Sequence, residues 1–215
     1  DFDFGTNDFS VKAWVKFPSN STFFFAQRAY YTGSAFSGPL FSLYATSGQL
    51  RFRISDDGDS TADNATSTST YGDDRWHLAV GVRRGSNIEL WVDGVQVATA
   101  AVSAAAASLS NSNAVLRWGC AVSVFAPLTG GYLTLGRISG TTPTPQQIRD
   151  MYEAEKALFQ PNAKCLLPAD SVSALAYDDS TDLLHVATTG GMARLRDLLV
   201  VAICLLASPA RTGWR

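Results

Sequence analysis

The sequence predicts an all-β protein: an antiparallel two-sheet β-sandwich with one late α-helix and a C-terminal β-hairpin. Three observations predict this class. About ten to twelve short segments have strand-like patterns, turn signals recur roughly every eight to twelve residues, and a clear helical pattern occurs only once. Two Greek-key sheets closed as a jelly roll are the natural arrangement for so many short strands.

The first quarter of the chain supplies four of the expected strands. Phe9 to Phe17 alternates cleanly, so its odd-numbered residues are all apolar and share one face. Thr22 to Tyr31 contains three phenylalanines and two tyrosines, which fits a fully buried strand. Leu40 to Tyr44 and Gln49 to Ser55 form a pair around the turn residues Thr46-Ser47-Gly48.

The chain is organised around a three-stranded meander from Trp76 to Thr99. Two tight turns divide it, and the second, Asp93-Gly94, is among the strongest hairpin signals a sequence can carry. In the middle strand, Ile88 to Val92, alternation turns the even-numbered apolar residues toward the core. Glu89 and Trp91 then lie on the opposite face, which we expect to be open to solvent or to a partner.

Weaker patterns surround this meander. Asp56 to Asp74 has no apolar run and predicts a long exposed loop, with room for one short strand near Ser67 to Tyr71. Val102 to Ser112 is rich in Ala and Ser and fits either a short helix or a loop. Further short strands are expected at Ala114–Trp118, Ala121–Phe125 and Tyr132–Ile138.

One helix is expected, beginning after Thr144. Pro145 occupies its first position, and Gln147 stands three residues after Thr144, the spacing of a capping box. Helical spacing of apolar residues continues to Phe159, and Pro161 then ends the helix.

The end of the chain predicts two further parts. We expect a jelly-roll domain over residues 1–160, a β-hairpin extension over 161–191 and an apolar tail over 192–215. The hairpin would pair Val172–Tyr177 with Leu183–Thr188. Within the tail, Leu198–Ala207 is nearly all apolar but only about half as long as a membrane span. It could be a buried helix, a partner-binding helix or sequence read in a changed frame.

Composition excludes several function classes. The net charge of −2 and the sequence pI of about 5.6 leave no basic field for nucleic acid. Two histidines and three widely spaced cysteines, without a C-x-x-C pair, argue against a zinc site. A Cys120–Cys165 disulfide is one option and buried free thiols are the other. The chain starts at Asp1 without a visible signal peptide, which indicates a fragment of a longer polypeptide or a processed chain.

Five short motifs resemble those of laminin-G-like, concanavalin A-like lectin jelly-roll domains. They are DFSVKAWV at 8–15, GQLRF at 48–52, WHLAV at 76–80, IELWVDG at 88–94 and LGR at 135–137. The five motifs follow the order and spacing of that family, and the resemblance covers about residues 1–160. The later segment Ala174–Thr188 resembles a segment that follows such domains in bacteriophage tail and other virion proteins. The resemblance implies a virion or extracellular location, with other copies, other virion or fibre subunits, or cell-surface glycans as partners.

Sugar binding by a lectin-like sandwich needs exposed aromatic rings with polar groups beside them. The candidate ligand-binding residues are Trp91, Glu89, Tyr71 and Trp118. Packing in the core or between subunits is the alternative role for these aromatic residues.

Calcium is the cofactor that such sandwiches often hold at a loop edge, where oxygen ligands suit a hard cation. The candidate ligands are Asp56, Asp57, Asp59 and Asp63. The alternative is a solvated polar loop, since these residues follow no fixed ligand spacing.

The sequence argues against catalysis. A retaining glycosidase needs two carboxylates about 5 to 5.5 Å apart, yet no strand carries two suitably spaced acids, and Glu89 is the only Glu before the helix. No G-x-S-x-G elbow occurs, and His77 and His185 fit structural positions. We therefore expect a non-enzymatic virion or tail-fibre-type module for glycan attachment or particle decoration. A purely structural subunit-docking module and an extracellular adhesion domain are the alternatives, and a glycoside hydrolase ranks last.

Overall fold

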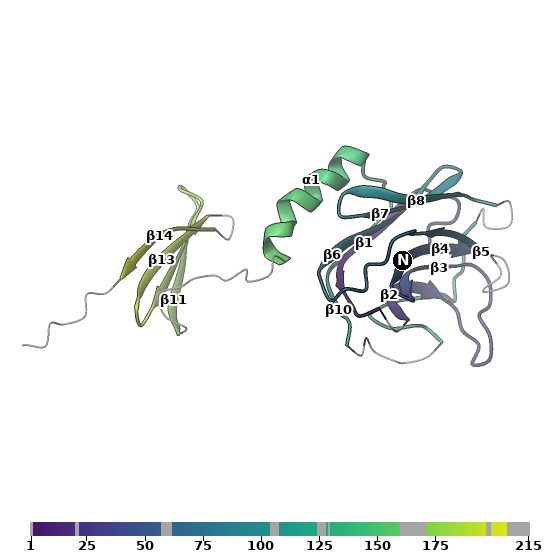
Figure 1. Ribbon diagram of the computed structural model, residues 1–215, viewed down its shortest axis with the longest axis horizontal. Coiled ribbons are helices and arrows are strands. Elements are labelled where there is room, and N and C mark those ends of the chain that lie inside the picture. Colours follow the sequence, from purple (N-terminus) through teal and green to yellow (C-terminus); the bar gives the residue numbers. More distant parts are fainter. Residues whose placement is uncertain are drawn as a thin grey trace, which may run out of the picture. The chain divides into compact units, whose positions relative to one another are not determined.

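The computed structural model describes residues 2–19, 22–56, 62–103, 108–123, 128, 130–159, 171–196 and 199–205. The chain divides into two compact units, Asp1–Gln160 and Pro161–Arg215 (Figure 1). Within the described ranges, the first unit contains two five-stranded sheets and a helix, and the second contains a four-stranded sheet. The predicted all-β class and the antiparallel sandwich are confirmed.

Two antiparallel sheets make up the first unit. The first sheet has the strand order β10 (Tyr132–Ser139), β1 (Phe9–Lys16), β6 (His77–Arg84), β7 (Asn87–Val92) and β8 (Val95–Ala101). The second sheet has the order β5 (Ala62–Thr66), β4 (Gln49–Ser55), β3 (Leu40–Thr46), β2 (Phe23–Ala29) and β9 (Val115–Trp118). In both sheets, strands distant in the sequence lie side by side, as in a Greek-key arrangement.

The core lies between these sheets and follows the predicted alternation. Phe9, its i+2 neighbours along β1, and the inward residues of β4 are all fully buried. The packing is tight enough to require a glycine on β6, since a Cβ at Gly81 would lie 2.4 Å from Cδ2 of Phe52. The predicted hairpin turn between β7 and β8 is also present, with Asp93 and Gly94 both at positive φ.

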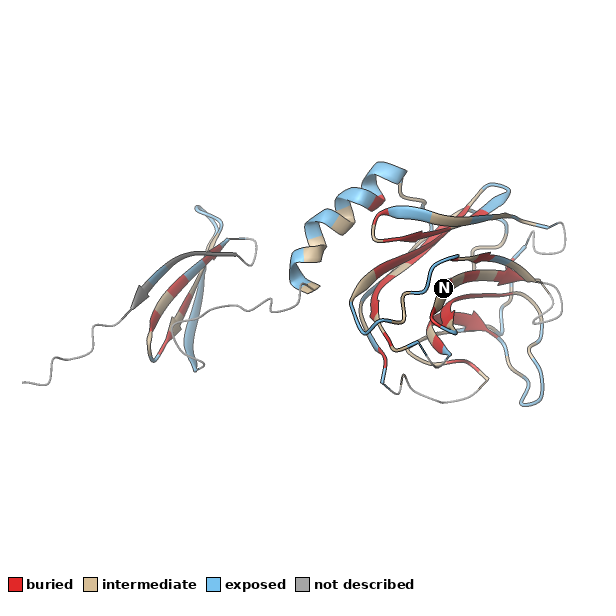
Figure 2. Cartoon of the chain, viewed as in Figure 1, coloured by how far each residue is buried: buried red, intermediate tan, exposed pale blue. Residues whose placement is uncertain are grey.

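The helix lies against the outer face of the first sheet. α1 spans Pro145–Glu155, and a 3₁₀ turn, η1, continues it over Lys156–Phe159. Both capping-box hydrogen bonds between Thr144 and Gln147 form, as expected. The inner side of the helix packs on Trp14, Trp91 and the outward side chains of β6, while its outer side is exposed (Figure 2). The first sheet is therefore covered on both faces.

The structure corrects two expectations in the first unit. The segment expected to be a loop with a strand near 67–71 instead forms β5 at Ala62–Thr66, because Ala65 fills the core while its neighbours pair with β4. No strand forms over 121–123, and residues 124 and 125 lie outside the described part of the chain. Cys120 is a free thiol, whereas Cys165 lies outside the described residues.

Among the described residues, the second unit is a four-stranded meander that contains the expected hairpin and adds two further strands to it. Its strands are β11 (Val172–Asp178), β12 (Leu183–Thr188), β13 (Gly191–Arg196) and β14 (Leu199–Leu205), in that order. Of the alternatives left open for the apolar tail, a helix does not apply to 199–205, which forms a strand that pairs antiparallel with β13. Val200, Val201 and Ile203 are β-branched and favour a strand. None of the helices in the described residues is long and apolar enough to cross a membrane.

Candidate ligand-binding face

Glu89 and Trp91, two of the predicted ligand-binding residues, lie together but are covered. The Trp91 indole Nε1 donates to Glu89 Oε2 at 2.9 Å, and Arg84 Nε donates to Glu89 Oε1 at 3.1 Å. Arg84 also donates to Thr142 and Pro143, which precede α1. The expectation that Trp91 is exposed is wrong, since the residue is 5% exposed beneath the helix. Alternation identifies a face of a strand, but not the element that covers it.

The other two aromatic candidates lie elsewhere. The ring of Tyr71 meets the His77 ring edge-on, with 5.1 Å between the ring centroids. Trp118 packs where the edges of the two sheets meet: a Cβ on Gly136 of β10 would lie 2.9 Å from its ring. The structure thus brings Glu89 and Trp91 together and leaves Tyr71 and Trp118 in two separate places, so the four do not form one site.

The predicted calcium loop lies only partly within the described residues. Asp57 and Asp59 fall outside them. Asp63 lies near the start of β5, and its Oδ2 accepts a 2.7 Å hydrogen bond from the backbone N–H of Ser103. Among the described residues, no group of three or more His, Cys, Asp or Glu is placed to hold a metal ion. Calcium at Asp56 to Asp63 remains a prediction.

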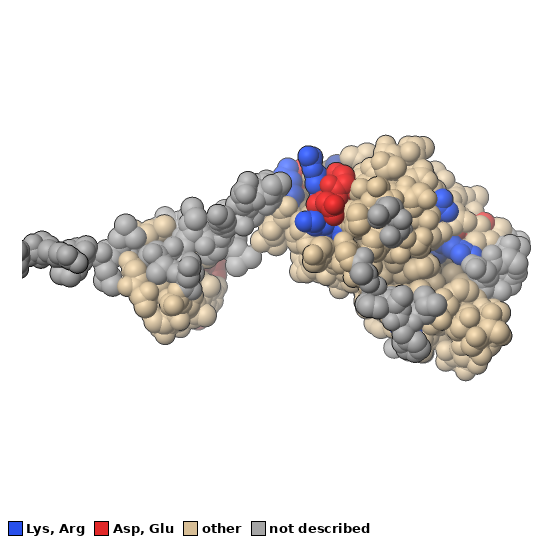
Figure 3. All heavy atoms as spheres, turned by 60° about the horizontal axis from the view of Figure 1, so that its bottom comes forward, with Lys and Arg blue, Asp and Glu red and all other residues tan. Residues whose placement is uncertain are grey.

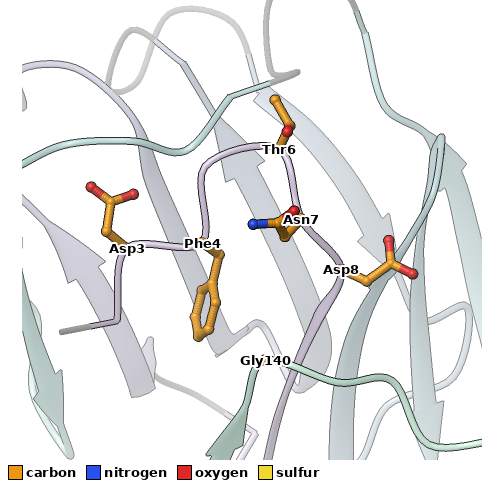
Figure 4. Close-up of a pocket in the computed structure, with 6 residues that line it drawn as sticks. All are labelled: Asp3, Phe4, Thr6, Asn7, Asp8 and Gly140. Carbon is orange, nitrogen blue, oxygen red and sulfur yellow. The ribbon is translucent and has the colours of Figure 1, made fainter.

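A shallow pocket of about 530 Å³ lies beside the N-terminal segment, lined by Asp3, Phe4, Thr6, Asn7, Asp8 and Gly140 (Figure 4). Its carboxylates already have structural partners. Asp3 accepts hydrogen bonds from Ser110 and Asn111, and Asp8 accepts one from the backbone N–H of Gly85. Burial raises the pKa of Asp3, but these hydrogen bonds outweigh it and lower the pKa overall. The carboxylates that line this pocket therefore hold the N-terminal segment in place by hydrogen bonds to other parts of the first unit.

His77 lies between two carboxylates at the end of the first sheet. Its Nδ1 is 2.7 Å from Asp93 Oδ2, and its Nε2 is 3.1 Å from Asp73 Oδ1. Burial lowers the pKa of His77, but the hydrogen bonds and charges of Asp93 and Asp73 outweigh it, so the pKa is raised above its ordinary value. This cluster ties the loop before β6 to the β7–β8 turn, which supports the structural role expected for His77.

The outer face of the second sheet carries the best candidate site. Side chains opposite one another in the strand register form two rows across the sheet. The glutamine row contains Asn64, Arg53, Ser42, Gln27 and Arg117. The tyrosine row contains Thr66, Arg51, Tyr44 and Phe24. These residues alternate with the core residues of their strands and therefore point away from the core.

A loop closes one end of this face over the glutamine row. The backbone N–H of Val122 donates to Gln27 Oε1 at 2.6 Å, and Gln27 Nε2 donates to Ser42 Oγ at 3.1 Å. Val122 also packs on Ala29 and Leu40. Gln27 and Ser42 are consequently buried. In the tyrosine row, Phe24, Arg51 and Thr66 are partly exposed, whereas Tyr44 is 8% exposed.

The tyrosine row combines a cation with aromatic rings. The rings of Phe24 and Tyr44 stack with centroids 5.3 Å apart and an interplanar angle of 12°. Arg51 lies directly opposite Tyr44 in the register, and among the described residues its guanidinium makes no hydrogen bond or ion pair. Its Nε is buried and has no hydrogen-bond partner in the described part of the chain. The row therefore holds a charged donor beside an aromatic pair, of which Phe24 is the partly exposed ring.

Sequence reasoning missed this row for a physical reason. The alternation of β4 predicts that Arg51 points outward, but an outward arginine is ordinarily a solvated residue. The useful signal is the register, which sets Arg51 beside Tyr44 on the neighbouring strand, and the register cannot be read from composition or periodicity.

Comparison with known proteins places the first unit in a family. The model of the concanavalin A-like lectin/glucanases superfamily matches residues 1–149. No curated protein matches the chain by sequence.

Several solved structures are similar in fold. The receptor binding domain of botulinum neurotoxin C/D mosaic serotype has a TM-score of 0.53 and 10% identity, over 89% of this chain and 47% of that one. The serotype D ligand binding domain in complex with N-acetylneuraminic acid has a TM-score of 0.52 and 12% identity, over 88% and 47%. The binding domain of botulinum neurotoxin DC in complex with rat synaptotagmin II has a TM-score of 0.53 and 11% identity, over 89% and 47%. The chain spans about half the length of these structures.

Proposed function

Because the chain belongs to the concanavalin A-like lectin/glucanases superfamily, we propose that it is a non-enzymatic attachment module of a virion or tail-fibre-type assembly, which binds acidic glycans on a host surface. The observation that carries the proposal is the tyrosine row, where Arg51 has no partner among the described residues and lies beside the stacked Phe24 and Tyr44 rings. An arginine can bind a carboxylate or sulfate with two parallel hydrogen bonds, while an aromatic ring stacks on the apolar face of a sugar.

The similar structures support a binding role. One of them is a neurotoxin domain in complex with N-acetylneuraminic acid, a sugar that carries a carboxylate, and another is in complex with a protein, rat synaptotagmin II. A shared fold does not by itself assign a ligand, so the proposal depends on Arg51 and its neighbours. The virion context is supported by the resemblance of Ala174–Thr188 to segments of phage tail proteins.

The carboxylates of Glu89 and Glu155 support a non-enzymatic role. Each is held by an arginine and by a tryptophan indole: Arg84 and Trp91 for Glu89, and Arg137 and Trp14 for Glu155. Carboxylates engaged in this way are not available as a glycosidase pair.

A glycan array probed with the full chain, with and without calcium, tests the proposal. The chain should bind glycans that carry a carboxylate or sulfate. Arg51→Ala should raise the dissociation constant by at least about tenfold, which is the effect of losing one hydrogen bond to a charged group. Arg149→Ala, an exposed arginine of α1, is the matched control and should bind as the parent does. Absence of binding in both calcium conditions, or unchanged binding by Arg51→Ala, would reject the proposal.

The second candidate function is subunit docking through the second unit. Leu175 and Tyr177 of β11 are 64% and 62% exposed, and the register places them on the same face as Val186 and Leu184 of β12. A four-stranded sheet with an apolar face ordinarily buries that face against another layer. A second copy of this chain is the partner we expect.

The oligomeric state of the full chain tests this candidate. In analytical ultracentrifugation the parent chain should associate, and the double variant Leu175→Ser, Tyr177→Ser should shift toward monomer. Asp179→Asn in the β11–β12 turn is the control and should associate as the parent does. A parent chain that is monomeric at all concentrations would count against docking between copies.

A further inference from the structure

Lys12 carries a positive charge that is not neutralised by a partner. It lies directly opposite Arg137 in the β1–β10 register, and like charges at opposite positions of a sheet repel. Glu155 is the nearby carboxylate, but both of its oxygens accept hydrogen bonds from the Arg137 guanidinium, at 2.7 and 2.8 Å. Its Oε2 also accepts a hydrogen bond from the indole N–H of Trp14. Among the described residues, the Lys12 ammonium makes no hydrogen bond or ion pair.

One group of acidic and basic side chains lies near α1, where basic groups flank acidic ones, and other charged side chains lie elsewhere on the first unit (Figure 3). Burial lowers the pKa of Lys12, Arg137 lowers it further, and Glu155 only partly opposes them. A bound anion would stabilise the protonated form of this amine.

Lys12 faces a pocket of about 470 Å³ between the first sheet and the start of the helix. The pocket is lined by Lys12, Thr141, Thr142, Pro143, Gln147 and Met151. It contains two hydroxyl groups and an amide besides the amine. Gln147 uses Oε1 to accept from the backbone N–H of Thr144, so its Nε2 is left to donate, and Thr142 Oγ1 accepts from Arg84, so its hydroxyl hydrogen is left to donate.

The segment that forms the wall of this pocket is held in place. Ser10 Oγ donates to the carbonyl of Thr141 at 3.0 Å, and Arg84 Nη2 donates to the carbonyl of Pro143 at 2.8 Å. The donors therefore lie on fixed backbone and need little ordering when a ligand binds.

We propose that this pocket is a binding site for a small oxyanion, the carboxylate, sulfate or phosphate group of a ligand, held by the Lys12 ammonium together with Thr142 and Gln147. The site is separate from the tyrosine row and lies on the other sheet, so it does not depend on the proposed function. Surplus positive charge and several hydrogen-bond donors around one fixed pocket are the features that bind oxyanions.

Isothermal titration of the full chain with three probes tests the site. Sodium sulfate, sodium phosphate and sodium glucuronate are titrated at constant ionic strength, with sodium chloride as the balancing salt. At least one probe should bind, and the arm that binds identifies the oxyanion. Lys12→Met should weaken that binding at least tenfold, whereas Lys16→Met should leave it unchanged. Lys16 is the matched control because it lies on the same face of β1, with its amine over the Tyr132 ring.

A second measurement on the parent chain covers the case in which Lys12→Met fails to fold. Lysine acetylation is mapped by peptide mass spectrometry with and without the bound probe. The probe should protect Lys12 at least threefold and leave Lys16 unaffected. Equal protection of both lysines, no protection of Lys12, or no binding of any probe would overturn the proposal.

Discussion

The indole Nε1 of Trp14 donates a 2.6 Å hydrogen bond to Oε2 of Glu155, although the two residues are 141 positions apart in the sequence. Arg137 donates to both oxygens of the same carboxylate. One side chain at the end of α1 thus joins the helix to β1 and β10. The hydrogen bonds and the charge of Arg137 outweigh burial and lower the pKa of Glu155, so the carboxylate stays ionised.

Glu155→Gln should destabilise the first unit. The amide keeps the shape of the side chain but loses the charge, and its NH₂ group cannot accept from Arg137 or Trp14. We expect the free energy of unfolding, measured by urea denaturation with tryptophan fluorescence, to fall by about 1–3 kcal/mol. Glu153→Gln is the control: Glu153 is 60% exposed on its side chain, against 17% for Glu155, and should change the value by less than about 0.5 kcal/mol. Equal losses in the two variants would contradict the prediction.

Trp91→Ala should damage the fold and leave glycan binding by the folded protein unchanged. Trp91 is buried between β7 and the helix, and removing it leaves a cavity and an unpaired oxygen on Glu89. The free energy of unfolding should fall by about 3–5 kcal/mol. Urea denaturation measures the loss of stability, and the glycan array measures the binding of the folded variant. A variant of parental stability that no longer binds would show that Trp91 contacts the ligand.

Gly81→Ala should strain the core between the two sheets. The new Cβ would lie 2.4 Å from Cδ2 of Phe52, whose ring is fully buried and has no space to move. Overpacking of this kind should lower the free energy of unfolding by about 1–3 kcal/mol. Gly140→Ala makes the same chemical change with 3.8 Å to its nearest neighbour, Phe4, and should be tolerated. If Gly81→Ala denatures at the same urea concentration as the parent, the core is looser than the structure indicates.

The His77 cluster should make stability depend on pH in two directions. The pKa of His77 is raised above its ordinary value of 6.5. The contribution of His77 to the free energy of unfolding is therefore complete below pH 6.5 and is lost as the pH rises through the pKa of the folded state. Neutral imidazole has a single N–H and can donate to only one of Asp73 and Asp93. The pKa of Asp73 is lowered from 3.8 because its hydrogen bonds to His77 and Arg75 outweigh burial, so its contribution is lost as pH falls through the folded value.

Urea denaturation of the parent and of His77→Gln from pH 4 to pH 9 measures this dependence. The difference in free energy of unfolding between the two should be largest between about pH 4 and 6.5 and should shrink toward alkaline pH. His185→Gln, in the second unit, is the control and should leave the pH profile of the first unit unchanged. A difference that grows above pH 7 would show that the neutral form of His77 is the one that stabilises the fold.

Much of the first unit could be predicted because two-residue alternation reports directly on burial. The even-numbered residues of β7 and the odd-numbered residues of β1 face the core as the pattern indicates. The hairpin turn at Asp93 and the cap at Thr144 are local features with strong residue preferences, so they could be placed as well.

The sites could not be predicted because they depend on contacts distant in the sequence. The alternation of β7 leaves the face of Trp91 open to solvent or to a partner, because nothing near β7 in the sequence indicates that α1 covers it. Arg51 and Tyr44 become neighbours only through the register of β3 and β4, and the hydrogen bonds of Glu155 go to Arg137 and not to Lys12 because the fold sets Arg137 beside it. The apolar segment at 199–205 shows a different limit, because a short apolar run has no period that separates a strand from a buried helix.

The covering of the first sheet on both faces has a consequence for sequence divergence. Substitutions in β1 and β6 meet packed neighbours whichever way the side chain points, between the core on one side and α1 on the other. On the second sheet, the outward residues of β4 and β5, such as Arg51, Arg53 and Thr66, are only partly buried, although Tyr44 of β3 beside them is 8% exposed. We therefore expect substitutions that change the proposed ligand binding to accumulate at outward positions of β4 and β5, while β1 and β6 vary less.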